Sequence, residues 1–107
     1  MKTITLKGKE YAPVSERVAQ LHKDNEFCSI VTEPEFKEGL CIFKATITTG
    51  LGEEKRTFTG HAFGKIGAEK AFEKLESVAV GRALAMAGYL AGGEIASYDE
   101  IEKFNQQ

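Results

Sequence analysis

Residues 65–93 constrain this chain more than any other stretch, because their apolar side chains recur with the period of a helix. This spacing predicts one amphipathic helix over 65–93. Its second half is built almost entirely of Ala, Gly and Leu, so its backbone can pack very close to a sheet or to another helix. Arg82 lies inside this run and must find a carboxylate, a carbonyl or a phosphate, because an unpaired buried charge is costly.

Glycines mark the middle and the end of this predicted helix. Gly81 costs up to about 1 kcal/mol relative to Ala in a helix interior, so its presence predicts a close approach to the backbone. Gly92 and Gly93 predict the carboxyl-terminal stop. Ser97 to Glu100 forms a capping box, which predicts a final short helix over 97–104.

Length and composition limit the class of protein. A chain of 107 residues with 42% hydrophobic content predicts a single domain over 1–107. A net charge of −2 argues against the strongly basic surface of many nucleic-acid-binding domains, so any such role must rest on local patches. The two cysteines and the absence of a signal-like start predict an intracellular protein with reduced thiols. No apolar run approaches the length needed to span a membrane, so we expect no membrane partner.

The remaining sequence predicts a helix followed by three strands. Residues 3–6 alternate like a short edge strand, and Val14, Val18 and Leu21 predict an amphipathic helix over 14–23 that ends at Asp24-Asn25. The expected strands and turns are 27–32, a polar turn over 34–39, a strand over 40–49, a hairpin loop over 50–54 and a strand over 55–63. The fold class is therefore α+β: a three-stranded antiparallel meander with a preceding helix, a long following helix and a short carboxyl-terminal helix.

Side-chain alternation predicts which residues share a face of the sheet. Cys41, Phe43, Ala45 and Ile47 fall on one face of strand 40–49, with Lys44 and the threonines on the other. On strand 55–63, Phe58, Gly60 and Ala62 share one face and His61 and Phe63 share the opposite one.

No pattern of residues predicts catalysis. His22 and His61 lie far apart in sequence, and Cys28 and Cys41 lack the short spacing of a zinc site. The glycines near 50 and 64 lack the complete spacing of a phosphate-binding loop. We therefore expect no enzyme activity, no metal and no cofactor.

Basic and aromatic residues near the hairpin and the long helix are the candidates for nucleic-acid binding. The candidates for phosphate contacts are Lys55, Arg56, Lys65, Lys70 and Lys74, which we expect on one rim of the fold. His61 and Phe63 are candidates for base stacking, together with Tyr98. The competing interpretations are ordinary ones: the helix lysines pair with neighbouring glutamates, and the aromatic residues belong to the core.

For Arg82 a structural ion pair is favoured over a phosphate contact, because an arginine in an apolar run usually has a charged partner that offsets the cost of its desolvation. Glu73 or Glu76 of a neighbouring subunit, or Glu94 or Asp99 of the same chain, are the expected partners. Glu76, Gly81, Arg82 and Ala85 are therefore assigned to structure or to a subunit interface. The small-residue face packs either on the sheet of its own domain or on another protomer, and the sequence leaves both open.

Two segments carry a resemblance to a known family. Glu76-Ser-Val-Ala-Val-Gly-Arg-Ala-Leu-Ala-Met-Ala-Gly-Tyr89, followed by Ile95-Ala-Ser-Tyr-Asp-Glu-Ile101, resembles phage single-strand annealing proteins of the essential recombination function type. The helix, meander and hairpin upstream more loosely resemble the β-β-β-α core of the wider group of Rad-type annealing proteins. The resemblance implies a protein of the bacterial cytoplasm that binds single-stranded DNA between hairpin and helix, forms homo-oligomeric rings or filaments, and anneals complementary strands without ATP.

Two alternatives remain. The order α-β-β-β-α, with Lys65 and Lys70 before the long helix, also resembles a double-stranded RNA-binding domain, although its lysine cluster is thinner than that family's. The second alternative is a non-catalytic oligomeric interaction protein whose Ala/Gly helix binds a copy of itself or another factor.

Overall fold

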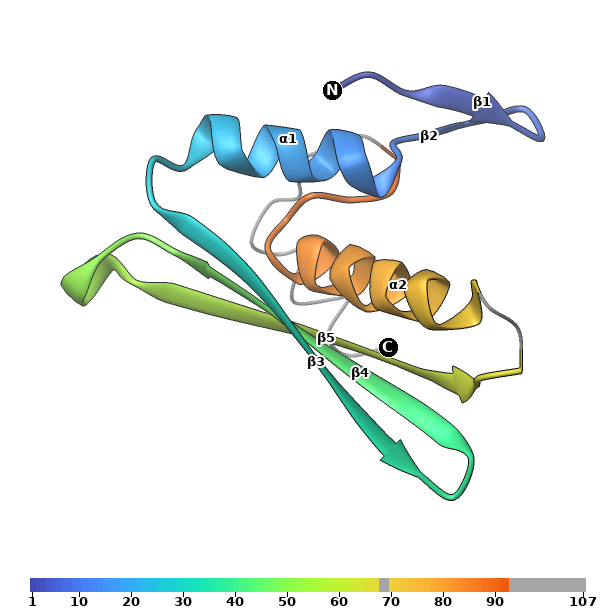
Figure 1. Cartoon of the computed structure of the whole chain (residues 1–107). Helices are drawn as coiled ribbons and strands as arrows, with labels where there is room; N and C mark the ends of the chain where they lie inside the picture. Colours follow the sequence, from blue (N-terminus) through green and yellow to red (C-terminus); the bar gives the residue numbers. More distant parts are fainter. Residues whose placement is uncertain (68–69, 93–107) are drawn as a thin grey trace.

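The computed structural model describes residues 1–67 and 70–92, which form an α+β fold (Figure 1). A small hairpin comes first, then a helix, a three-stranded antiparallel sheet and a second helix. The elements are β1 (Ile4–Leu6), β2 (Lys9–Tyr11), α1 (Val14–Asp24), β3 (Cys28–Lys37), β4 (Leu40–Thr49), β5 (Arg56–Lys65) and α2 (Ala71–Met86). Both helices lie on the same side of the sheet, with α2 directly against it (Figure 1). The predicted fold class is confirmed.

β4 is the central strand and supplies four buried core residues. It pairs with β3 on one side and β5 on the other, so that Ala45 lies opposite both Thr32 and Gly60. Its buried side chains are Cys41, Phe43, Ala45 and Ile47, which face α2 as the alternation predicts. Phe43 meets Phe72 of α2 edge to face, with ring centroids 4.8 Å apart. The sheet therefore has one covered face and one open face.

The predicted bounds are wrong for the turn over 34–39 and for the strand over 55–63, which runs to Lys65. The polar turn predicted over 34–39 is strand as far as Lys37, and only Glu38 and Gly39, with φ of 51° and 79°, make the turn. Pro34 is tolerated there because β3 is an edge strand, where a missing N–H need not break the ladder. The strand predicted over 3–6 pairs with β2 and not with the main sheet.

The long helix is shorter than the predicted 65–93 at both ends. α2 begins at Ala71 and ends at Met86, and Gly88 rather than Gly92-Gly93 provides the stop. Gly88 has φ of 102°, its N–H donates to Ala85 O at 3.0 Å, and the N–H of Tyr89 donates to Leu84 O at 2.8 Å. This pair of bonds is a Schellman motif. The prediction failed because buried Tyr89 and half-buried Leu90 continue the apolar pattern beyond the helix end; the helix predicted over 97–104 lies outside the described residues.

Small residues bring α2 close to two neighbours. At Gly60 of β5, an added Cβ would lie 2.3 Å from Ala83 N and 2.5 Å from Ala79 O, so the helix backbone rests on the strand backbone. At Gly81, an added Cβ would meet the Arg17 Nη2 of α1 at 3.3 Å. Through Ala79 and Ala83, α2 thus rests on the sheet of its own domain, whereas Gly81 faces α1.

A buried arginine that the sequence analysis did not single out joins the two helices. Arg17 of α1 is only 4% exposed. Its Nε donates to Ala12 O at 3.1 Å, and its Nη1 donates to Gly81 O at 3.2 Å and to Tyr89 O at 3.4 Å. A sequence signal exists, because position 17 lies on the same helix face as Val14, Val18 and Leu21.

Tyr89 connects the end of α2 to the end of α1. Its hydroxyl donates to Asp24 Oδ2 at 2.9 Å and accepts from Asn25 Nδ2 at 3.4 Å. Burial of the phenol, together with its hydrogen bond to Asp24, raises the pKa of Tyr89 from 10.0 to about 12. The folded protein therefore holds this proton at pH values where the unfolded chain releases it.

This difference predicts a loss of stability in alkaline solution. The contribution of Tyr89 to the free energy of unfolding is complete below pH 10 and declines as the pH rises toward 12, because the raised pKa belongs to the folded state. Tyr89→Phe removes this dependence and costs about 1 kcal/mol at neutral pH for the lost hydrogen bond. Urea unfolding of both proteins at pH 8 and pH 11.5 measures the difference. Equal losses of stability in the two proteins would contradict the assignment.

Candidate nucleic-acid interface

The open sheet face, meaning the face of β3, β4 and β5 turned away from α2, carries residues of different character on its two sides. β3 presents Glu33 and Glu35, and β5 presents His61, Phe63 and Lys65. The strand register places Lys44 of β4 between them, directly opposite both Glu33 and His61. The face is therefore acidic along β3 and basic and aromatic along β5.

Phe63 is the most exposed large apolar side chain of the described residues. It is 73% exposed and lies opposite Ile42, with His61 and Lys65 two positions away on the same face. Cβ atoms of directly opposed residues are about 5 Å apart, so Ile42 is the nearest cross-strand neighbour of Phe63 on β4, and most of the ring surface remains exposed. An aromatic side chain held on a strand with its ring open to solvent is suited to stacking against a planar ligand.

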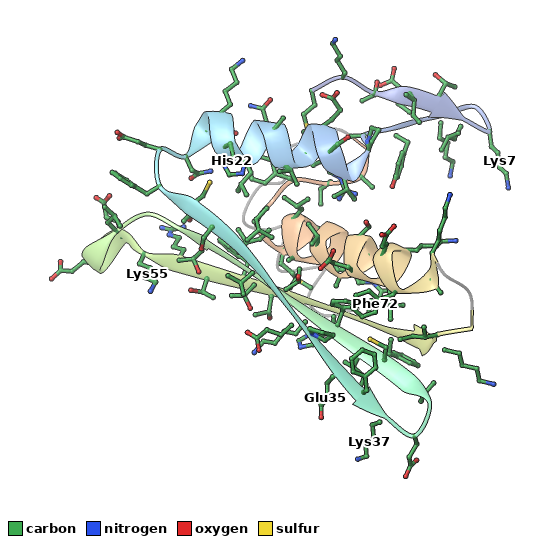
Figure 2. All side chains as sticks on the ribbon, viewed as in Figure 1. Lys7, His22, Glu35, Lys37, Lys55 and Phe72 are labelled. Carbon is green, nitrogen blue, oxygen red and sulfur yellow. The ribbon has the colours of Figure 1, made fainter. Side chains whose placement is uncertain are left out.

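The five basic residues predicted to contact phosphate are divided between the two ends of the sheet. Lys55 and Arg56 lie at the hairpin end, whereas Lys65 lies at the far end of β5, about 30 Å away for a strand of this length. Figure 2 shows Lys55 at one end of the sheet and Lys37, the last residue of β3, at the other; Leu40 of β4 separates Lys37 from Lys65. Arg56 also borders a pocket lined by Glu53 and Glu54, which offsets its charge.

Three of the five predicted residues lie toward the same end of the fold. Lys65 ends β5, Lys70 immediately precedes α2 and Lys74 lies in its first turn, and all three side chains are exposed. The end of β5 and the start of α2 are neighbours, since a Cβ at Gly64 would lie 3.2 Å from Leu75 Cδ1 (Figure 1). Lys65 lies on the open sheet face, turned away from α2, whereas Lys70 and Lys74 belong to the α2 side of the sheet, and the hairpin pair lies at the other end of the sheet.

Arg82 and Glu76, which were predicted to have structural roles, both form hydrogen bonds to the sheet. Arg82 Nη1 donates to His61 O at 2.7 Å, so its guanidinium is tied to a backbone carbonyl. Glu76 Oε2 accepts from Thr32 Oγ1 at 2.6 Å and joins α2 to β3, while Ala85 is nearly buried. Two of the predicted partners of Arg82, Glu94 and Asp99, lie outside the described residues.

The bond from Arg82 also covers part of a sheet edge. β5 is an edge strand, and the His61 carbonyl that Arg82 binds points away from β4. Pro34 occupies the middle of the opposite edge strand, β3. A charged side chain and a proline are the usual protections of an exposed edge against pairing with another strand. Both edge strands therefore carry, near their middle, a feature that disfavours pairing with a further strand.

One residue of the candidate interface was not among the predicted site residues. Lys44 lies at the centre of the open sheet face, and its position follows from the alternation of β4. The predicted site rested on basic residues near the hairpin and the helix start, and Lys44 lies near neither because it is in the middle of β4. The pattern that could have found it is the exposed face that Lys44 shares with His61 and Phe63.

A metal site has little support within residues 1–67 and 70–92. No group of three or more His, Cys, Asp or Glu side chains is close enough there to hold an ion. Cys28 and Cys41 are both free thiols, and Cys28 Sγ lies 3.1 Å from His22 Nδ1. Two donors on the surface form at most half of a tetrahedral site.

Comparisons of the chain with protein-family models, curated proteins and solved structures find no match. No helix in the described part of the chain is long and apolar enough to cross a membrane.

Proposed function

We propose that this protein binds single-stranded DNA on the β4–β5 half of the open sheet face. The observation that carries the proposal is the exposed ring of Phe63, placed between His61 and Lys65 and next to the strand that bears Lys44. Proteins that bind single strands combine aromatic side chains, on which bases stack, with cations that follow the backbone. Unstacked bases reach such a platform, whereas bases within a duplex do not.

The charges of the face define a path for the strand. Glu33 and Glu35 repel phosphate from β3, so the bound strand follows β4 and β5 instead. Beyond Lys65 the path continues to Lys70 at the start of α2. Stacking accepts any base and lysine contacts read only phosphate, so we expect little sequence specificity.

Annealing of complementary strands without ATP, by a self-associated protein, forms the finer part of the proposal. It is supported by the resemblance of residues 76–89 and 95–101 to phage annealing proteins. A sheet that holds bases by stacking on one side leaves their pairing edges free for a second strand. Light scattering with and without an oligonucleotide gives the size of the assembly, and fluorescence of two labelled complementary strands reports their annealing.

The first test removes the stacking ring. Phe63→Ala should weaken binding of a labelled single strand about 5- to 150-fold, because one stacked base contributes about 1–3 kcal/mol. Phe27→Ala is the matched control, since Phe27 is also exposed but lies just before β3, at the end of the sheet away from Phe63. Fluorescence anisotropy measures both affinities. An equal affinity of the Phe63→Ala protein and the unchanged protein would remove Phe63 from the site.

The second arm of this test separates the phosphate path from general electrostatics. Lys44→Gln with Lys65→Gln should weaken binding and lower the salt dependence by about 0.7 for each lost contact. Lys55→Gln with Arg56→Gln removes the same charge at the hairpin end and should have little effect. Equal losses in both double variants would contradict the path. A preference for duplex RNA would favour the double-stranded RNA-binding alternative, and no binding at low salt would favour the interaction protein.

A further inference from the structure

An apolar groove lies along α2, beside the start of α1. It is separate from the open sheet face. It encloses about 560 Å³ between α2, the start of α1 and the segment after α2. Its walls are the apolar side chains of Tyr11, Val14, Val78, Ala85, Leu90 and Ala91. Val78 is 37% exposed there, so apolar surface remains uncovered in the described part of the chain.

Two cations and a hydroxyl border this apolar floor. Lys74 and Arg82 line the groove about two helical turns apart on α2, and Ser77 lies between them. Arg82 uses one nitrogen to bind His61 O and retains other N–H donors. An occupant that matches this groove therefore has an apolar stripe with carboxylates beside it.

Residues 93–107 of the same chain have that chemistry. They contain Glu94, Asp99, Glu100 and Glu102 against the single lysine Lys103. Tyr98, Ile101 and Phe104 recur at a spacing of three, which places them along one side of a helix. This segment also starts beside the groove, because it follows Ala91 and Gly92 directly and Ala91 is part of the groove wall.

We propose that the groove is the docking site of this chain's own residues 94–104, with Tyr98, Ile101 and Phe104 on the apolar floor. The acidic side chains then lie beside Lys74 and Arg82. A segment connected by two or three residues has a high effective concentration at the groove, which favours docking within one molecule over docking between molecules. The proposal is independent of nucleic-acid binding and assigns Lys74 to the segment rather than to phosphate.

The chain allows a direct test because its 107 residues contain no tryptophan. Phe104→Trp therefore introduces a single indole that reports on the segment alone. We expect emission shifted to short wavelength and protection from quenching by acrylamide. Val78→Asp in the groove should move the emission to that of a solvated indole, whereas Val31→Asp, at an exposed valine on the open sheet face, should not.

A second substitution guards against misfolding of the Val78→Asp protein. Lys74→Glu reverses an exposed charge at the groove and should also shift the emission to longer wavelength, whereas Lys23→Glu on exposed α1 should leave it unchanged. Circular dichroism checks that each variant is folded. Solvated emission in the Phe104→Trp parent, or emission that neither groove variant changes, would overturn the proposal. A blue shift lost on dilution would overturn it as well, because the occupant would then belong to a second copy.

Discussion

Gly60→Ala should destabilise the protein by about 3 kcal/mol, at the upper end of the cost of overpacking. A Cβ at this position would lie 2.3 Å from Ala83 N, 2.5 Å from Ala79 O and 2.8 Å from Arg82 C. These are backbone atoms of α2, so no side chain can rotate away to make room. The helix must move off the sheet, and the contacts between α2 and the core around Phe43 loosen with it.

Thermal unfolding followed by circular dichroism measures this effect. For a domain of this size, about 3 kcal/mol lowers the Tm by roughly 12 °C or more. Gly67→Ala is the matched control, because an added Cβ there meets nothing within 4 Å. We expect that control to stay within about 0.5 kcal/mol of the unchanged protein. A Gly60→Ala protein as stable as the Gly67→Ala protein would show that α2 does not rest on β5 as described.

The pattern of apolar residues was sufficient to predict the sheet. Alternation along β4 and β5 placed Phe43 in the core and Phe63 on the open face, because a period of two has only one arrangement with the apolar side buried. The same use of periodicity predicted a helix over 65–93, which is longer than α2 (Ala71–Met86). Tyr89 is buried although it follows the Schellman turn at Gly88, and a periodicity count cannot distinguish a buried loop residue from another turn of helix.

The candidate site was predictable in its parts and not in its arrangement. Residue types correctly drew attention to Phe63 and Lys65, which are neighbours on one face. The separation of Arg56 from Lys65 depends on strand length and hairpin geometry, since two residues of one strand lie at opposite ends of the sheet when ten residues span it. The helical spacing places Arg17 on the apolar face of α1, but the carbonyls of Gly81 and Tyr89 that it binds lie more than 60 residues away in the sequence, so no local window predicts them.

Arg17→Ala should cost about 3–5 kcal/mol, because it removes three hydrogen bonds from a charged donor and leaves buried carbonyl acceptors without a partner. Arg17 donates to the carbonyls of Ala12, Gly81 and Tyr89, and these three acceptors belong to the chain before α1, the middle of α2 and the turn after α2. Without the guanidinium, polar groups at this junction lose their partners in a place where water has little access. The cost of leaving them unsatisfied adds to the lost packing of the side chain.

Arg17→Lys separates the charge from the geometry. Lysine keeps the positive charge and most of the stem, yet it lacks a donor at the Nε position and the planar fork that serves several carbonyls together. We expect Arg17→Lys to fall between the unchanged protein and Arg17→Ala in urea unfolding. Lys23→Ala, an exposed cation on the same helix, should change stability by less than about 0.5 kcal/mol. If Arg17→Ala matched Lys23→Ala instead, the junction of α1 and α2 would be held by apolar packing alone.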